Sequence, residues 1–81
     1  MKIKMNYKNT KMNYQFEDII IMNNKPSKVE IQNKCVDWAK TKAVFQLDKQ
    51  FQVFSKEWWD NYHDIKQWTD TNKISAEVIE E

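Results

Sequence analysis

The sequence contains no glycine among its 81 residues, and this absence restricts both its turns and its chemistry. Glycine normally supplies the left-handed backbone of tight turns, so turns here have to rely on residues such as asparagine that tolerate this conformation. The P-loop, the dinucleotide-binding motif G-x-G-x-x-G and the nucleophile elbow G-x-S-x-G all need glycine. These three kinds of site are therefore excluded.

Length and composition indicate one small globular domain spanning residues 1–81. The chain is 41% apolar and 31% charged, which fits neither a disordered tail nor a membrane span. A domain of this size buries a modest fraction of its surface, so a few large side chains have to form the core. Four tryptophans, four phenylalanines and three tyrosines can do so.

Arginine is also absent, whereas lysine occurs thirteen times and asparagine and isoleucine eight times each. This bias is typical of AT-rich coding, as in low-GC bacteria and their phages. Without arginine, bidentate recognition of phosphate or carboxylate is not possible, and lysine is left for contacts with anions.

A single cysteine, Cys35, excludes an intramolecular disulfide and a thiolate zinc site. A reducing compartment is the simplest setting for such a chain. The longest apolar run, at residues 19–22, is too short for a signal peptide or a spanning helix. We therefore expect a cytoplasmic protein (in the host cell if the source is viral) with no cofactor and no membrane partner.

Two segments near the N-terminus, residues 3–7 and 12–16, alternate between apolar and polar side chains. Strict alternation predicts half-buried strands. Asn9-Thr10 between them is a candidate turn, although the Asn-Gly pair of a strong hairpin signal is absent. We therefore expect an N-terminal hairpin.

Two serines predict the starts of helices. Ser27 and Glu30 have the spacing of a capping box, which predicts a helix over about 28–42. Ser55 is a second N-cap, and the helix that it starts should run to about residue 70. On that helix one apolar face is expected to hold the fold, and it consists of Trp58, Tyr62 and Ile65.

Residues 44–54 fit two interpretations. As a hairpin with its loop at 48–50, the segment places Leu47 opposite Phe51, with the apolar side chains on one face. As a helix, it continues a heptad pattern of apolar residues to Trp68. The β-branched and aromatic content favours the hairpin.

These elements predict an α+β domain in the order β-β-α-β-β-α. Its antiparallel sheet would consist of two hairpins, with both helices packed on one face. The alternative is a chain that is mostly helical after residue 27. The acidic segment 71–81 is either a short docking segment or a frayed tail.

The helix after Ser55 carries the residues that we predict to contact a partner. Trp59 and Trp68 lie on opposite sides of its apolar face, so one of them should be partly exposed, as hot-spot tryptophans are. Large rings that seal a small core and a solvated charged face are the ordinary alternatives. With the acidic strip beside Trp68, the predicted partner-binding residues are Trp59, Trp68, Glu57, Asp60 and Asp64.

The charge is unevenly distributed, with +5 over residues 1–54 and −4 over residues 55–81. Lysines interleaved with aromatic residues are typical of platforms for single-stranded nucleic acid. Lysine on an outer strand also protects it against edge-to-edge pairing. The residues that would bind nucleic acid are Lys2, Lys4, Lys8, Lys11, Tyr7 and Tyr14.

Catalytic and metal sites are not expected. His63 with Asp60 and Asp64 has the helical proximity of a metal cluster, but the chain has only one histidine and one cysteine. Cys35 lies on the apolar side of its helix, where a buried and unreactive thiol is usual. We therefore expect that the protein is not an enzyme and holds no metal.

By elimination, the sequence favours a non-catalytic protein-binding module. Its size suits a single binding surface. The coding bias fits a phage or mobile-element inhibitor that blocks a host or defence protein, as anti-CRISPR proteins do. The alternative is a small nucleic-acid-binding or transcriptional regulatory protein that uses the basic N-terminal strands.

Overall fold

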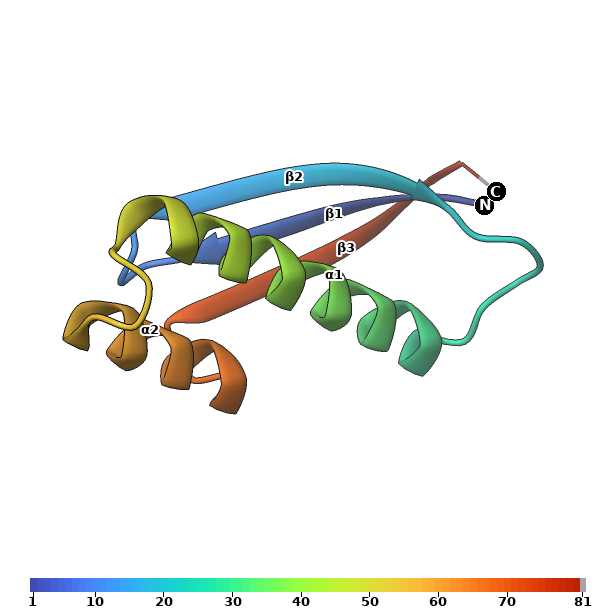
Figure 1. Ribbon diagram of the computed structural model, residues 1–81. Helices are drawn as coiled ribbons and strands as arrows, with labels where there is room; N and C mark the ends of the chain where they lie inside the picture. Colours follow the sequence, from blue (N-terminus) through green and yellow to red (C-terminus); the bar gives the residue numbers. More distant parts are fainter. Residues whose placement is uncertain (81) are drawn as a thin grey trace.

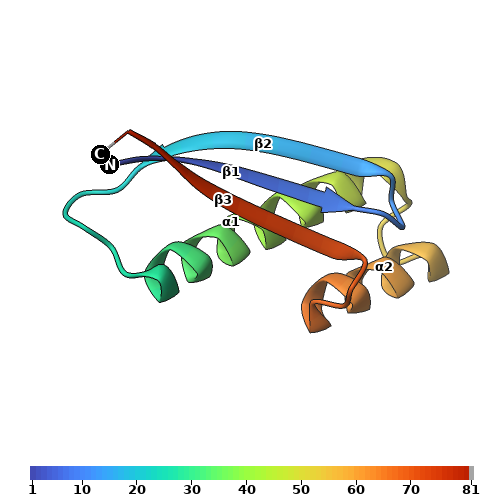
Figure 2. The ribbon, with the colours of Figure 1, turned by 180° about the vertical axis from the view of Figure 1, so that it is seen from behind.

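Three antiparallel strands and two helices form the fold in the computed structural model, which describes residues 1–80 (Figure 1). The strand order is β2-β1-β3, so the N-terminal strand lies in the middle of the sheet. Both helices lie on the same side of the sheet (Figures 1 and 2). The elements are β1 (Lys2–Asn9), β2 (Tyr14–Ile21), α1 (Lys28–Gln50), α2 (Lys56–Gln67) and β3 (Asn72–Glu80).

The predicted α+β class is confirmed, but the predicted order of the elements is wrong. The chain follows β-β-α-α-β, because the hairpin predicted for residues 44–54 does not form and α1 continues to Gln50. The third strand instead comes from residues 72–80, for which the sequence left a docking segment or a frayed tail. The alternative, a mostly helical chain after residue 27, fits the chain as far as Gln67 and misses β3.

The second half of α1 is helical because its buried face continues without a break. Four buried residues at four-residue spacing line one side of the helix: Cys35, Ala39, Ala43 and Leu47. Three of them pack with Tyr7 of β1 in one core cluster. Phe45 and Val53, which a hairpin would have paired, are 60% and 46% exposed. Packing of the stripe therefore outweighs the strand propensity of this segment.

Both predicted helix starts are confirmed by their N-caps. The Ser27 side chain accepts a hydrogen bond from the Glu30 backbone amide at 3.2 Å. The Ser55 side chain accepts one from the Trp58 amide, also at 3.2 Å. Each serine thus satisfies a backbone donor that the first helical turn leaves free.

The predicted N-terminal hairpin is also confirmed, with residues 10–13 joining its strands. The alternation along β1 separates the two faces of the sheet. Ile3, Met5 and Tyr7 are buried toward the helices, and the alternate residues Lys2, Lys4, Asn6 and Lys8 lie on the opposite face.

A buried hydrogen-bond network connects β1, β3 and the end of α2. The Tyr7 hydroxyl donates to Asn72 Oδ1 at 2.7 Å, and Asn9 Nδ2 donates to the same oxygen at 2.9 Å. Asn72 Nδ2 in turn donates to the Asp64 carbonyl of α2 at 3.1 Å. Burial raises the pKa of Tyr7, so its hydroxyl stays protonated as the donor. Asn72 therefore links the last strand both to the central strand and to a helix.

Without glycine, four other residues adopt positive φ angles: Asn13, Asn24, Phe54 and Trp68. Asparagine tolerates this conformation, whereas a large aromatic residue loses about 1–2 kcal/mol in it. Trp68 ends α2 with φ at 55°, and its amide donates to the carbonyls of the last helical turn. Its ring stacks on Tyr7 at a centroid distance of 5.9 Å, which compensates for the strain.

We expect Trp68→Gly to be less destabilising than Trp68→Ala by about 1 kcal/mol, because both variants remove the ring and only glycine relieves the left-handed backbone. Urea denaturation followed by circular dichroism measures both free energies of unfolding. Trp38, in the middle of α1, is the matched control. There glycine should be worse than alanine by about 1 kcal/mol. If glycine is more destabilising than alanine at both positions, the backbone at Trp68 is not strained.

Candidate functional site

An exposed group of stacked rings lies where the α1–α2 connection enters α2. We define the aromatic surface as Phe54, Trp59 and His63. Phe54 is 68% exposed and Trp59 41% exposed. The Trp59 ring stacks on Phe54 at a centroid distance of 5.6 Å and on His63 at 5.9 Å, with interplanar angles of 19° and 28°. The three rings thus present one continuous aromatic face to solvent.

The capping geometry of α2 determines the position of this surface. Ser55 is the N-cap, so Phe54 directly precedes the cap and Trp59 is the fourth helical residue. Apolar residues at these two positions commonly pack against each other as a hydrophobic staple. The Phe54–Trp59 stack therefore fixes both the angle at which the chain enters α2 and the orientation of the exposed rings.

The buried ring of Trp58 supports the aromatic surface from below. Trp58 is 6% exposed and stacks nearly parallel on Tyr62, at 5.0 Å and 7°. Its Nε1 donates to Asp48 Oδ1 of α1 at 2.9 Å. Trp59 meets the Trp58 ring edge-on at 4.8 Å. Because Trp58 is held by packing and by a hydrogen bond, the rings above it have little freedom to rotate.

Phe54 adopts a left-handed backbone, with φ at 68°. An exposed phenylalanine in this conformation loses stability that an asparagine or a glycine would retain. Strained residues of this kind concentrate at functional sites. The strain at Phe54 therefore singles out the aromatic surface among the exposed apolar groups of the molecule.

The two tryptophans predicted to contact a partner lie in different environments. Trp59 belongs to the aromatic surface. Trp68 is half-buried, stacks on Tyr7, and carries the Lys40 ammonium over its ring at 5.9 Å. Trp68 thus packs toward the core of the fold, and Trp59 is the more exposed of the two.

The residues of the predicted acidic strip differ in their contacts. Asp64 forms an ion pair with Lys11 of the β1–β2 loop at 2.7 Å. Glu57 and Asp60 are exposed on α2. The acidic strip lies on the Trp68 side of α2, and Trp68 packs on the sheet, whereas Trp59 lies on the other flank of the helix. The strip and the aromatic surface therefore face in different directions.

The structure separates the lysines and tyrosines that were predicted to bind nucleic acid. Tyr7 and Tyr14 pack toward the helices, with their ring centroids 6.1 Å apart. Lys2, Lys4 and Lys8 lie on the opposite face of β1. Lys2 pairs with Glu80 at 3.3 Å and Lys4 with Glu17 at 2.9 Å, and the latter contact raises the pKa of Lys4. The interleaving in the sequence therefore does not give a mixed basic and aromatic face.

The potential catalytic and metal-binding residues are not brought together. Within residues 1–80, no three side chains of histidine, cysteine, aspartate or glutamate are grouped so that they could hold a metal ion. His63 stacks on Trp59, while Asp64 pairs with Lys11. Cys35 is buried between α1 and β3, and burial raises the pKa of its thiol.

The sequence interpretation missed two members of the site, His63 and Phe54. His63 was considered only as part of a metal cluster, and Phe54 was placed at the end of the hairpin predicted for residues 44–54, where it had no role at a surface. The spacing of Phe54, Ser55 and Trp59 is the signal that could have identified Phe54, because it fits a hydrophobic staple around an N-cap.

A comparison with known protein families found no family model that matches, and comparisons with curated proteins and with solved structures found no similar protein. In the described part of the chain, no helix combines the length and the apolar character needed to cross a membrane. The function therefore has to be inferred from the site itself.

Proposed function

We propose that this chain is a non-catalytic protein-binding module that uses the aromatic surface of Phe54, Trp59 and His63 to occupy a surface of a partner protein. One observation carries the proposal: two large rings, held rigidly against each other, are exposed beside a strained residue. Rigid aromatic rings contribute much of the binding energy at protein interfaces, since they bury a large area at a small cost in entropy.

The wider context supports an inhibitory role for this module. The size of the domain suits a single surface for binding a partner. Its coding bias fits a phage or mobile-element product that blocks a host or defence protein. Nucleic-acid binding has less support, because Lys2, Lys4 and Lys11 are already paired with carboxylates.

Binding and stability are expected to respond differently to changes in the aromatic surface. Phe54→Asn should leave the free energy of unfolding within about 1 kcal/mol of wild type, because asparagine relieves the backbone strain while the staple contact is lost. Phe54→Asn and Trp59→Ala should each weaken binding by about 2 kcal/mol or more, the usual scale for a hot-spot residue.

The partner is first captured from a low-GC bacterial lysate with the wild-type protein, and its affinity for each variant is then measured by calorimetry. Ile19→Ala is the control, because Ile19 is an exposed apolar residue on the face of the sheet opposite the helices. A partner that binds Phe54→Asn and Trp59→Ala as tightly as it binds wild type would show that the contact surface lies elsewhere.

A further inference from the structure

The outer edge of β3 is the most open part of the sheet. Within residues 1–80, β3 pairs with β1 alone, and seven of its nine residues are exposed. The other edge strand, β2, is exposed only at alternate residues. β3 thus exposes side chains on both faces, beside a row of backbone groups that no neighbouring strand binds.

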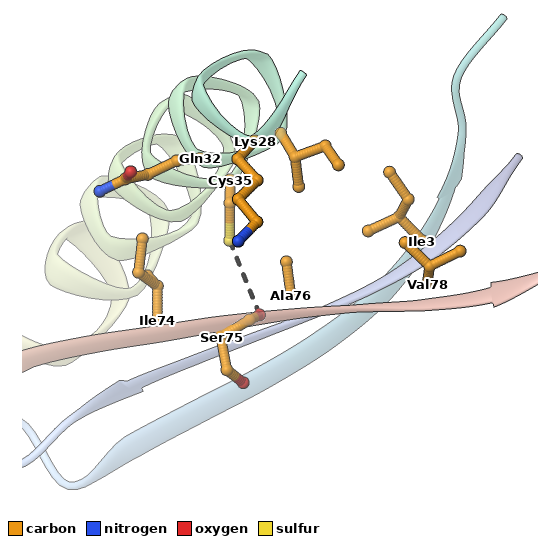
Figure 3. A pocket seen from close by; sticks show the side chains of 9 residues that line it. Ile3, Lys28, Gln32, Cys35, Ile74, Ser75, Ala76 and Val78 are labelled. Atoms are coloured by element: carbon orange, nitrogen blue, oxygen red, sulfur yellow. Dashed lines mark hydrogen bonds between the residues drawn. The ribbon is translucent and has the colours of Figure 1, made fainter. Parts of the chain in front are cut away.

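An apolar groove runs beside this edge on the helix side of the sheet. It has a volume of about 450 Å³ and lies between β3 and the first half of α1. Ile74, Ala76 and Val78 point from β3 toward α1, whereas Ser75 points to the other face (Figure 3). The apolar side of β3 is therefore only partly covered by its own helix.

Lys73, on the other face of β3, has no compensating charge among residues 1–80 of its own chain, whereas Glu77 lies opposite Lys4, whose main partner is Glu17. Lys73 lies directly opposite Lys8 of β1, and like charges at such positions destabilise a sheet. Neither Lys73 nor Glu77 belongs to any of the ion pairs found within residues 1–80. Both side chains lie on the face of the sheet away from the helices, two positions on either side of Ser75.

We propose that β3 pairs antiparallel with β3 of a second copy of the chain, with the two Ser75 residues facing each other. In this register, Lys73 of each copy lies opposite Glu77 of the other, so two new cross-strand ion pairs form beside the Lys8–Lys73 repulsion. Ile74 lies opposite Ala76 of the second copy, which extends the apolar face between the two grooves. The result is a continuous sheet of six strands.

Neighbouring registers fit less well. A shift by one residue places the apolar side of one β3 against the charged side of the other. A centre at Glu77 brings two glutamates together, and a centre at Ala76 places Lys73 opposite Ile79, next to the irregularity where β3 pairs with Lys2 and Ile3. Of these registers, only the one centred on Ser75 places both Lys73 and Glu77 opposite a residue of opposite charge in the second copy.

The test is a charge exchange followed by sedimentation velocity over a concentration series at low salt. Wild type is expected to dimerise. Lys73→Glu and Glu77→Lys should each weaken self-association by at least about tenfold, because each creates two like-charge contacts across the two-fold axis. An equimolar mixture of the two variants should associate like wild type, since every contact between them is again of opposite charge.

Folding of the variants is checked separately by thermal denaturation. Lys73→Glu should melt no lower than wild type at concentrations where both are monomers, because it removes the repulsion with Lys8. Wild type that stays monomeric at every concentration overturns the proposal and leaves the edge to a strand from a different protein. Single variants that dimerise like wild type, or a mixture that does not recover, overturn it as well.

Discussion

Trp58→Ala is expected to lower the free energy of unfolding by about 3–5 kcal/mol, the cost of removing a large buried ring. A domain of this size has only about 5–15 kcal/mol in total, so the variant should be largely unfolded on modest heating. Trp58 joins α2 to α1 through its hydrogen bond to Asp48, and within α2 its ring stacks on Tyr62. Urea denaturation followed by tryptophan fluorescence and circular dichroism measures the loss.

The neighbouring tryptophan provides a matched control. Trp59 has the same side chain and lies one residue further along α2, but it is exposed. Trp59→Ala should therefore cost only about 1 kcal/mol, the value of its ring contacts. Equal losses of stability at the two positions would contradict the placement of Trp58 in the core and Trp59 at the surface.

Asn72→Ala is expected to destabilise the fold by about 3 kcal/mol or more. The change leaves the Tyr7 hydroxyl without its acceptor, takes an acceptor from Asn9 Nδ2 and removes one of the donors to the Asp64 carbonyl, and each buried polar group left unsatisfied costs about 1–3 kcal/mol. The melting temperature should fall by about 10–20 °C, as expected for a domain of this size. Differential scanning calorimetry measures the shift.

Asn33→Ala serves as the control for this prediction. Asn33 is exposed on α1, so alanine should be neutral or slightly stabilising through its higher helix propensity. Tyr7→Phe provides an intermediate case, because it removes one hydroxyl and leaves the Asn9–Asn72 hydrogen bond in place. A melting temperature of Asn72→Ala close to that of Asn33→Ala would refute the role of the network.

Local signals were sufficient for most of the fold. The alternation along residues 3–7 predicted a strand, and Ser27 and Ser55 predicted helix starts, because each pattern has a direct cause in local geometry. Residues 44–54 were different, since their apolar spacing fits two periods. The choice depended on Leu47 continuing the buried stripe of α1, which is a property of the packed protein.

β3 carried a local signal that the sequence interpretation did not use. Residues 73–78 alternate between polar and apolar side chains, as residues 3–7 do, but they were treated as part of an acidic segment, and their pairing with β1 makes them a strand. The candidate site depended more on the packed structure. The helical wheel identified Trp59 and Trp68 as opposite flanks of α2, but only the left-handed end of the helix turns Trp68 onto Tyr7.

The central position of β1 has a consequence for how the chain reaches its native state. β1 meets β2 through a short turn, but it meets β3 only after a loop of more than sixty residues closes, as the Tyr7–Asn72 contact with a separation of 65 shows. Loop-closure entropy rises with loop length, and distant pairings slow folding. During synthesis, the second edge of β1 therefore stays unpaired until residues 72–80 have left the ribosome, and docking of β3 is expected to be the step that sets the folding rate.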